Sequence, residues 1–166
     1  MENLKNGDIP KEGWVCENVI DRKYTLNLMQ GIKYDSCEMC GNTKLRYVHI
    51  MKHPDYPNTL GVDCECAEKM SNDYTNPKLR EEALRKKFYR RNNFVYEFWN
   101  ISKDKKTYTK KHRGVVITMK EAEDGKWGVL WDDQEMWEYN GFAIDSYDNA
   151  ENVAFEVIEK LAPSKR

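Results

Sequence analysis

The chain has 166 residues, of which 40% are hydrophobic and 33% are charged, and its formal net charge is −1. Residues 1–113 carry 22 basic and 16 acidic side chains, a net charge of +6, whereas residues 114–166 carry 5 and 12, a net charge of −7. This composition is typical of a globular protein with one ordinary domain or two small ones, and the asymmetry predicts different partners for the two parts. No membrane contact is expected, because no apolar run approaches the roughly 18 residues of a transmembrane helix.

Two close cysteine pairs are the most informative feature of the N-terminal part. Cys37 and Cys40 have the spacing C-x-x-C and are followed by glycine, whereas Cys64 and Cys66 have the spacing C-x-C. Four thiolates satisfy the tetrahedral coordination of zinc, and glycine suits the turn of such a half-site. We therefore predict one structural Zn²⁺ per chain, bound by Cys37, Cys40, Cys64 and Cys66. Should one member of the second pair fail to reach the metal, three side chains could replace it: Cys16, His49 and His53.

The cysteines also indicate the redox compartment. The count of five is odd, the pairs are too close for framework disulfides, and no apolar signal region follows Met1. We therefore expect a cytoplasmic protein. Four thiolate ligands leave no open coordination position, so hydrolysis at this zinc is not expected. The chain has no P-loop or dinucleotide fingerprint, so no small-molecule cofactor is expected.

The elements around the cysteines follow the order of a treble clef. A short strand is predicted at residues 14–16, and the Tyr, Val and Ile of residues 44–51 favour a second strand. Turn residues follow, after which residues 59–62 can return antiparallel, and a helix is expected after Cys66. Residues 1–75 are therefore interpreted as a zinc-binding, treble-clef-like unit of knuckle, hairpin and helix.

Residues 76–113 are interpreted as a long basic helix followed by a linker. Asn76 can cap this helix, and Pro77 suits its first position. Residues 78–113 hold 13 basic and 4 acidic side chains, a net charge of +9, which favours contact with nucleic-acid phosphates. Residues 101–113 are polar and Lys-rich, which predicts a loop or an ordered arm. The side chains expected to meet phosphates are Arg85, Lys86, Lys87, Arg90, Arg91, Lys110 and Lys111.

Residues 114–166 predict a C-terminal unit of three strands and one helix. The strands are expected at residues 115–119, 126–131 and 136–144, with turns between them. Asp148 and Glu151 have the spacing of a capping box, and apolar residues then recur at three and four positions. The predicted fold class is therefore α+β, with a treble-clef-like zinc unit, a long basic helix, and a C-terminal three-stranded antiparallel sheet packed on one helix.

Acidic and tryptophan side chains gather around the last turn and the third strand of this sheet. Such a combination is typical of a surface that binds a basic protein partner. Two other interpretations stay open: the acidic residues cover the basic helix within the chain, or the tryptophans belong to the core. The residues of this acidic patch are Trp131, Asp132, Asp133, Glu135, Trp137 and Glu138.

The string CEMCGNTKLRYVHI, followed by CAEKM, resembles the zinc-knuckle half of the HNH nucleases over residues 37–70. The resemblance implies that His49, in the run VHI, is the general base of a metal-dependent nuclease. The chain departs from the family pattern, because no Asp precedes His49, and Glu65 and Ala67 stand where the family offers its last His or Asn. Together with the basic helix and the C-terminal sheet, the strings are also similar to uncharacterised bacterial and phage-borne proteins, which implies that setting without an activity.

The segment RGVVITMKEAEDGKWGVLW, followed by SYDNAENVAFEVI, resembles the DNA-binding domains of plant ethylene-response factors and of phage integrase arms. The shared features are Arg113-Gly114-Val115, Gly125-Lys126-Trp127 and the aromatic and alanine positions at the start of the helix. The resemblance implies a three-stranded sheet with one helix, whose sheet face enters the major groove. The acidic turns of this chain depart from that pattern and repel phosphate.

From these patterns we expect a zinc-stabilised, nucleic-acid-associated binding protein of bacterial or phage origin, and not an enzyme. The alternative is a phage- or mobile-element-encoded protein-binding factor or inhibitor that acts through its acidic C-terminal unit. An HNH-like metal-dependent nuclease is the third hypothesis.

Overall fold

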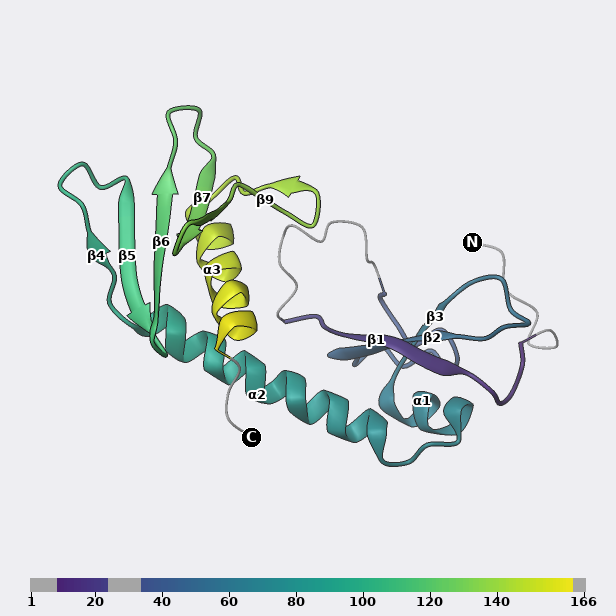
Figure 1. Ribbon diagram of the computed structural model, residues 1–166. Coiled ribbons are helices and arrows are strands. Elements are labelled where there is room, and N and C mark those ends of the chain that lie inside the picture. The colour runs from purple at the N-terminus through teal and green to yellow at the C-terminus, as the bar shows by residue number, and fades with distance from the viewer. Residues whose placement is uncertain (1–8, 24–33, 163–166) are drawn as a thin grey trace. The chain divides into compact units, whose positions relative to one another are not determined.

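A computed structural model describes residues 9–23 and 34–162, which form three helices and antiparallel sheets (Figure 1). The α+β class is therefore confirmed. The chain divides into two compact units, with the boundary between Lys87 and Phe88. We call the described residues before this boundary unit 1 and those after it unit 2. No helix in the described parts of the chain is long and apolar enough to cross a membrane.

Unit 1 contains a three-stranded antiparallel sheet and a short helix. The strands β1 (Val15–Asp21), β2 (Tyr47–Lys52) and β3 (Leu60–Val62) lie in the order β1-β2-β3, and α1 (Cys64–Ser71) packs against β1 and β2. Between β2 and β3, the Asp55 amide donates to His53 Nδ1 at 3.0 Å, which stabilises the turn. The sequence predicted this hairpin and the helix that follows it.

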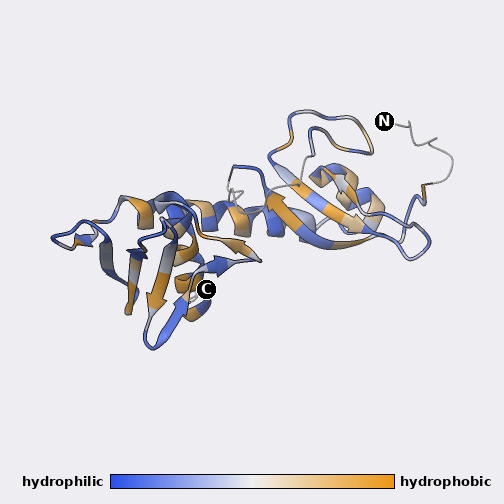
Figure 2. Ribbon diagram, turned by 90° about the horizontal axis from the view of Figure 1, so that it is seen from above, coloured by the Kyte–Doolittle hydropathy of each residue, from blue (hydrophilic) through white to orange (hydrophobic). Residues whose placement is uncertain are grey.

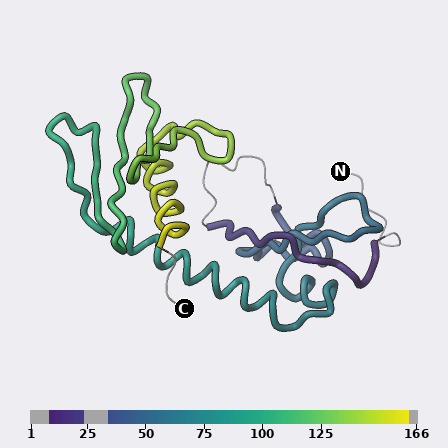
Figure 3. The backbone as a smooth tube through the Cα atoms, viewed as in Figure 1, coloured from purple at the N-terminus to yellow at the C-terminus, as the bar shows by residue number. Residues whose placement is uncertain are grey.

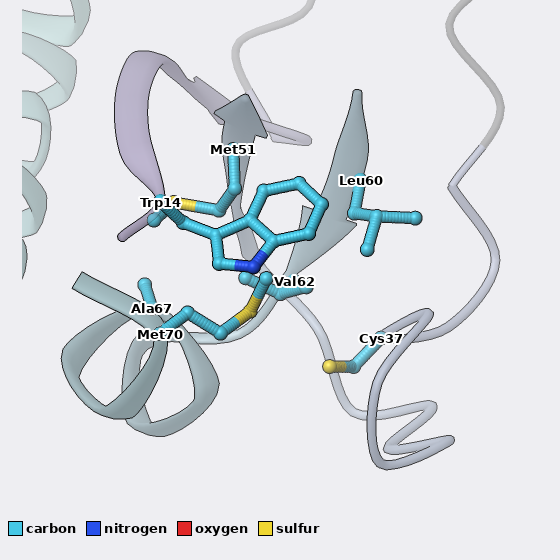
Figure 4. Packing of buried hydrophobic residues seen from close by; sticks show 7 residues of the cluster. All are labelled: Trp14, Cys37, Met51, Leu60, Val62, Ala67 and Met70. Carbon is cyan, nitrogen blue, oxygen red and sulfur yellow. The ribbon is translucent and has the colours of Figure 1, made fainter. Parts of the chain in front are cut away.

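The core of unit 1 is small and is built around one tryptophan. Trp14 lies at the centre of the buried cluster, with Met51 and Met70 on two sides of the indole (Figure 4). Its indole Nε1 donates to the Pro10 carbonyl at 2.7 Å, and its amide donates to the Met70 carbonyl at 3.2 Å. The fully buried Cys37 belongs to the same cluster, so the first cysteine pair is tied directly to the core.

The long basic helix is α2 (Asn76–Tyr96), and it contributes residues to both units. Its first turn is capped by Asp73, whose carboxylate accepts from the amides of Thr75 and Asn76, each at 3.0 Å. Near its other end, Phe94 is fully buried in unit 2. The segment 101–113, predicted as a loop or arm, instead supplies strands of the unit 2 sheet.

Unit 2 contains a five-stranded antiparallel meander, which can be followed along the tube in Figure 3. Helix α3 (Tyr147–Leu161) packs against β6 and β7, and the Ser146 hydroxyl caps it by accepting from the Asn149 amide at 3.3 Å. The cap therefore lies at Ser146, and not at the predicted Asp148. The strands are, in order, β4 (Asn100–Ile101), β5 (Thr107–His112), β6 (Val115–Glu121), β7 (Trp127–Trp131) and β8 (Gln134–Met136).

The expected three-stranded sheet is thus the C-terminal part of a larger one, and its third strand, expected at residues 136–144, instead lies at Gln134–Met136. After β8 the chain leaves the sheet and forms a separate hairpin of β9 (Glu138–Tyr139) and β10 (Phe142–Ala143). Trp137 lies at this departure and covers Gly128, where a Cβ atom would approach the indole at 2.7 Å. Because Gly128 has no side chain, the Trp137 indole can pack directly against the backbone of β7.

The two faces of the unit 2 sheet differ in chemistry. Ile117, Met119 and Val129 are fully buried on the face that α3 covers. On the opposite face, the hydroxyls of Thr109 and Thr118 are hydrogen-bonded at 3.1 Å. Figure 2 shows that the strands contain both hydrophobic and hydrophilic residues, as expected when one face of a sheet is buried.

Glu151 of α3 is a buried carboxyl group whose protonation affects the stability of unit 2. Burial raises its pKa above the usual 4.5, while the Trp99 indole N–H, at 2.8 Å, and the charges of Lys110 and Arg91 act in the opposite direction, as does the Tyr147 hydroxyl. Because the folded-state pKa is raised, this group stabilises the fold most below pH 4.5, and that contribution is lost as the pH rises through the raised pKa.

As the pH is raised from acidic to neutral, the wild type should lose the stability contributed by Glu151, whereas Glu151→Gln should not. We therefore expect the melting temperature of the variant minus that of the wild type to increase over this pH range. The glutamine keeps an oxygen to accept from the Trp99 indole but cannot ionise. Tryptophan fluorescence can follow the transition, since four of the five tryptophans belong to unit 2. A difference between the two proteins that is constant with pH would contradict this assignment.

Candidate metal centre

The first half of the centre is a tight turn at the first cysteine pair. The Gly41 amide donates to the Cys37 carbonyl and the Cys37 amide donates to the Asn42 carbonyl, each at 2.8 Å. Gly41 has a φ of +76°, which glycine adopts without strain. The turn is fixed to β3, because the Gly61 amide donates to Glu38 Oε2 at 2.6 Å. These contacts hold Cys37 and Cys40 beside the start of α1.

The second half of the centre is the N-terminus of α1. Asp63 is the N-cap residue, and its Oδ1 accepts from the Cys66 amide at 2.8 Å. Asp63 and Cys66 have the same x-x spacing as Cys37 and Cys40, and one helical turn brings both side chains to the same side. The aspartate therefore takes the position that a first cysteine occupies in an ordinary C-x-x-C half-site.

Four ligand groups meet between these two halves. One ligand atom each of Cys37, Cys40, Asp63 and Cys66 lies within 4.8 Å of the other three, which is a spacing that can hold a metal ion. The Cys40 thiol donates to Asp63 Oδ2 at 3.2 Å, and the Asp63 amide donates to Cys37 Sγ at 3.4 Å. Cys37 is buried, Cys40 is exposed, and the other two are half-buried. The centre thus lies at the edge of the core, where an ion has access.

One of the four ligand groups, Asp63, is ionised before any metal binds. Partial burial acts to raise the pKa of Asp63, but hydrogen bonds from the Cys66 amide, the Cys40 thiol and the Asn42 amide group hold that pKa below its usual value. Burial and the neighbouring Cys37 raise the pKa of the Cys66 thiol. A metal ion at this place must therefore displace thiol protons, while the carboxylate is already ionised.

The structure differs from the sequence prediction at one ligand, because Cys64 lies in another group. Successive residues of a helix are rotated by about 100°, so side chains two positions apart face nearly opposite directions. Cys64 accordingly points toward His49 and Glu81, and their ligand atoms also lie within 4.8 Å of one another.

Asp63 was not predicted as a ligand from the sequence, although its D-x-x-C spacing could have revealed it. The suggested substitutes Cys16, His49 and His53 are not among the four clustered groups.

The predicted phosphate contacts divide into internal and exposed side chains. Arg90 forms two hydrogen bonds to the Glu159 carboxylate, at 3.1 and 2.6 Å, and Arg91 Nε donates to Asn152 Oδ1 at 2.6 Å. Lys110 is 2% exposed and donates to the Phe94 carbonyl at 2.5 Å. These three cations hold unit 2 together. The remaining four are exposed or half-buried: Arg85, Lys86, Lys87 and Lys111.

The acidic patch is exposed, whereas its tryptophans are partly covered. Asp132, Asp133, Glu135 and Glu138 are exposed, and Trp131 and Trp137 are half-buried. Trp131 lines a hollow of about 410 Å³ on the sheet together with Val116, Thr118, Leu130 and Asp132. Trp137 instead packs over Gly128. The structure therefore separates the two tryptophans, which the sequence analysis had grouped.

A basic surface on the open face of the unit 2 sheet was only partly anticipated. Strand register places Lys111 opposite Val116, Thr109 opposite Thr118, and Thr107 opposite Lys120, so all six side chains share one face. Lys111 and Lys120 are exposed and form no ion pair within the described parts of the chain. Three exposed lysines follow in the turn between β4 and β5: Lys103, Lys105 and Lys106. We call these five lysines and the three threonines the open sheet face.

Comparison with known proteins gives no match: no family model matches the chain, and neither a curated protein nor a solved structure is significantly similar to it.

Proposed function

We propose that this protein is a zinc-stabilised nucleic-acid-binding protein, in which the metal orders unit 1 and the open sheet face of unit 2 contacts phosphates. The observation that carries the proposal is the arrangement of lysines and threonines on a sheet face that α3 leaves uncovered. Lysine ammonium groups and threonine hydroxyls are frequent partners of backbone phosphates. Sheets are also established readers of nucleic acid.

Zinc is the metal that the first cluster favours. Three thiolates and one carboxylate provide the soft and hard donors that tetrahedral zinc accepts. The order of knuckle, β2–β3 hairpin and α1 supports a treble-clef arrangement of unit 1. We assign this ion a structural role, since four protein ligands leave no position for a reacting water.

The charge of the open sheet face supports a polyanionic ligand. Five lysines contribute to it, and the one acidic residue in the turn, Asp104, is engaged locally by the Ser102 hydroxyl at 2.5 Å and the Lys106 amide at 3.1 Å. Glu135 lies at the far edge, on β8. Of the seven predicted side chains, Lys111 is retained here, and Arg85, Lys86 and the half-buried Lys87 are secondary contacts on α2. The other three, Arg90, Arg91 and Lys110, are withdrawn.

The double variant Lys111→Glu with Lys120→Glu reverses two charges of the open sheet face and should weaken binding to labelled DNA by about tenfold or more. Each phosphate contact contributes roughly −0.9 to the slope of log affinity against log salt on a duplex, and roughly −0.7 on a single strand. Fluorescence anisotropy at several salt concentrations should therefore also show a shallower slope, by about 2 on duplex DNA.

The matched control is Lys69→Glu with Lys160→Glu, which makes the same change in net charge on the exposed sides of α1 and α3. It should bind nearly as the wild type does. Equal losses in the two double variants would mean that only net charge matters, and would contradict a specific sheet face.

A protein partner is the second candidate function, favoured by the hollow beside the acidic patch. Its walls are apolar at Val116 and Leu130 and acidic at Asp132, which suits a basic side chain with an apolar stem. Absence of DNA and RNA binding by the wild-type protein in the same assay would favour this candidate. The nuclease hypothesis is the weakest, because His49 is 0% exposed and its Nε2 is hydrogen-bonded to Glu81 at 2.9 Å.

A further inference from the structure

A second group of ligand side chains lies in unit 1, and the first metal centre does not use it. Its members come from three elements: His49 from β2, Cys64 from the first position of α1, and Glu81 from α2. His49 Nε2 lies 2.9 Å from Glu81 Oε1, and ligand atoms of all three side chains lie within 4.8 Å of one another. Three segments distant in sequence thus converge on one point.

Packing alone does not account for the polar atoms at this place. The Tyr47 hydroxyl and His49 Nδ1 are both buried and have no hydrogen-bond partner of good geometry among the described residues, although the Cys16 thiol lies close to the His49 ring. Leaving a buried polar group without a partner is unfavourable, so such atoms require an explanation. Residues 47 and 49 lie on the same face of β2, since side chains alternate along a strand. The Tyr47 hydroxyl therefore borders the same region as the three ligands, whereas His49 Nδ1 points away from Glu81, because Nε2 is the nitrogen that faces it.

The region is accessible from solvent through a groove. A cavity of about 490 Å³ is lined by Tyr47, Cys64 and Glu81, and also by Cys40 and Asp63 of the first centre. His49 does not line this cavity and is fully buried. A small ion can thus reach Cys64 and Glu81 from the groove, and His49 Nε2 lies 2.9 Å from the Glu81 carboxylate.

We infer that His49, Cys64 and Glu81 form a second site for a divalent transition metal, with zinc as the expected ion. A thiolate and an imidazole select zinc or cobalt over magnesium and calcium, which prefer oxygen ligands. Three protein ligands leave one tetrahedral position open, and the groove supplies water or a small anion to it. This site is therefore exchangeable, in contrast to the closed first centre.

The C-x-C pair is central to this assignment, because it serves two ions. Cys66 faces the first centre and Cys64 faces the second, as the rotation between helix positions requires. Asp63 then completes the first centre in place of Cys64. The inference goes beyond the proposed function, and its test does not depend on nucleic-acid binding.

Elemental analysis of the full chain after zinc loading and gel filtration should find two ions per chain. Cys64→Ser and Glu81→Gln should each reduce the content to one, whereas Asp63→Asn should weaken only the first centre. The inference is overturned if the wild type holds only one ion, if Cys64→Ser releases that ion, and if Glu81→Gln and Asp63→Asn leave the metal content unchanged. This is the result expected when the first centre uses four thiolates.

Cobalt substitution provides a second readout that does not depend on stoichiometry. Azide should change the absorption of the Co²⁺-loaded wild type, because a small anion can occupy the open position. The same addition should leave the spectrum of Co²⁺-loaded Glu81→Gln unchanged, since only the closed centre remains loaded. Circular dichroism of each variant checks that the fold is retained. An azide response that survives in Glu81→Gln would contradict the assigned ligands.

Discussion

Removing zinc with a chelator at neutral pH is expected to unfold unit 1 and to leave unit 2 folded. The cluster around Trp14 is small, and the centre joins the turn at Cys37 to the start of α1. Metal binding to such units is coupled to folding, and structural zinc contributes about 10–16 kcal/mol in small zinc-binding peptides. The sheet of unit 2 has a core of its own and none of the candidate metal groups found in the described residues.

Hydrogen exchange followed by mass spectrometry distinguishes the two units in one experiment. After chelation, amide protection should disappear from β2, β3 and α1 and persist in β6, β7 and α3. Cys37→Ser should give the same pattern without a chelator. The matched control is Cys16→Ser, because Cys16 is half-buried in the same unit and lies outside the first candidate metal group, although its thiol interacts with His49 of the second. Unchanged protection of unit 1 in metal-free protein would refute the structural role.

Phe94→Ala is expected to cost unit 2 about 3–5 kcal/mol, which is the usual range for a buried phenylalanine. The ring is fully buried and contacts Trp99, His112 and Phe155, with centroid distances of 5.7, 5.2 and 5.7 Å. Lys110 Nζ lies 3.9 Å from the same ring, so the variant also exposes a buried cation to a cavity. Since domains are stable by about 5–15 kcal/mol, this loss is a large share of the total.

Phe98→Ala is the matched control, because Phe98 lies only four residues away and is 97% exposed. Its free energy of unfolding should stay within about 0.5 kcal/mol of the wild type. Urea unfolding followed by tryptophan fluorescence measures both variants. Similar losses in the two would mean that the aromatic cluster around Phe94 is not the core of unit 2.

Local patterns predicted those elements whose residues interact with near neighbours in sequence. The hairpin of β2 and β3 was predicted from strand-forming residues on both sides of a turn, and α3 was predicted from its apolar period. Both signals are short-range, so a single sequence contains them. The pairing of Cys37 with Cys40 has the same character, because two intervening residues suffice to bring both sulfurs together.

Contacts between distant segments account for what the sequence did not reveal. The sequence of β5 resembles a lysine-rich linker, because a lysine is normally expected in solvent. Only the tertiary structure shows that Lys110 is buried against Phe94 and Trp99. In the sequence, Asp63 has the features of an ordinary helix cap. Its role as a candidate metal ligand appears only when the fold brings Cys37 and Cys40 close to it. The division of Cys64 from Cys66 likewise depends on where α1 begins, and that boundary is one of the least predictable features of a sequence.

The burial of Lys110 has a consequence for the chemistry of the surface. Its amine lies 3.9 Å from the Phe94 ring centroid and 4.3 Å from that of Trp99, and desolvation lowers its pKa, whereas Lys111 projects into solvent. Reagents that acylate amines therefore meet one hidden and one accessible lysine at adjacent positions of the same strand. The ratio of Lys110 labelling to Lys111 labelling therefore reports whether unit 2 is folded, and this ratio does not depend on the protein concentration.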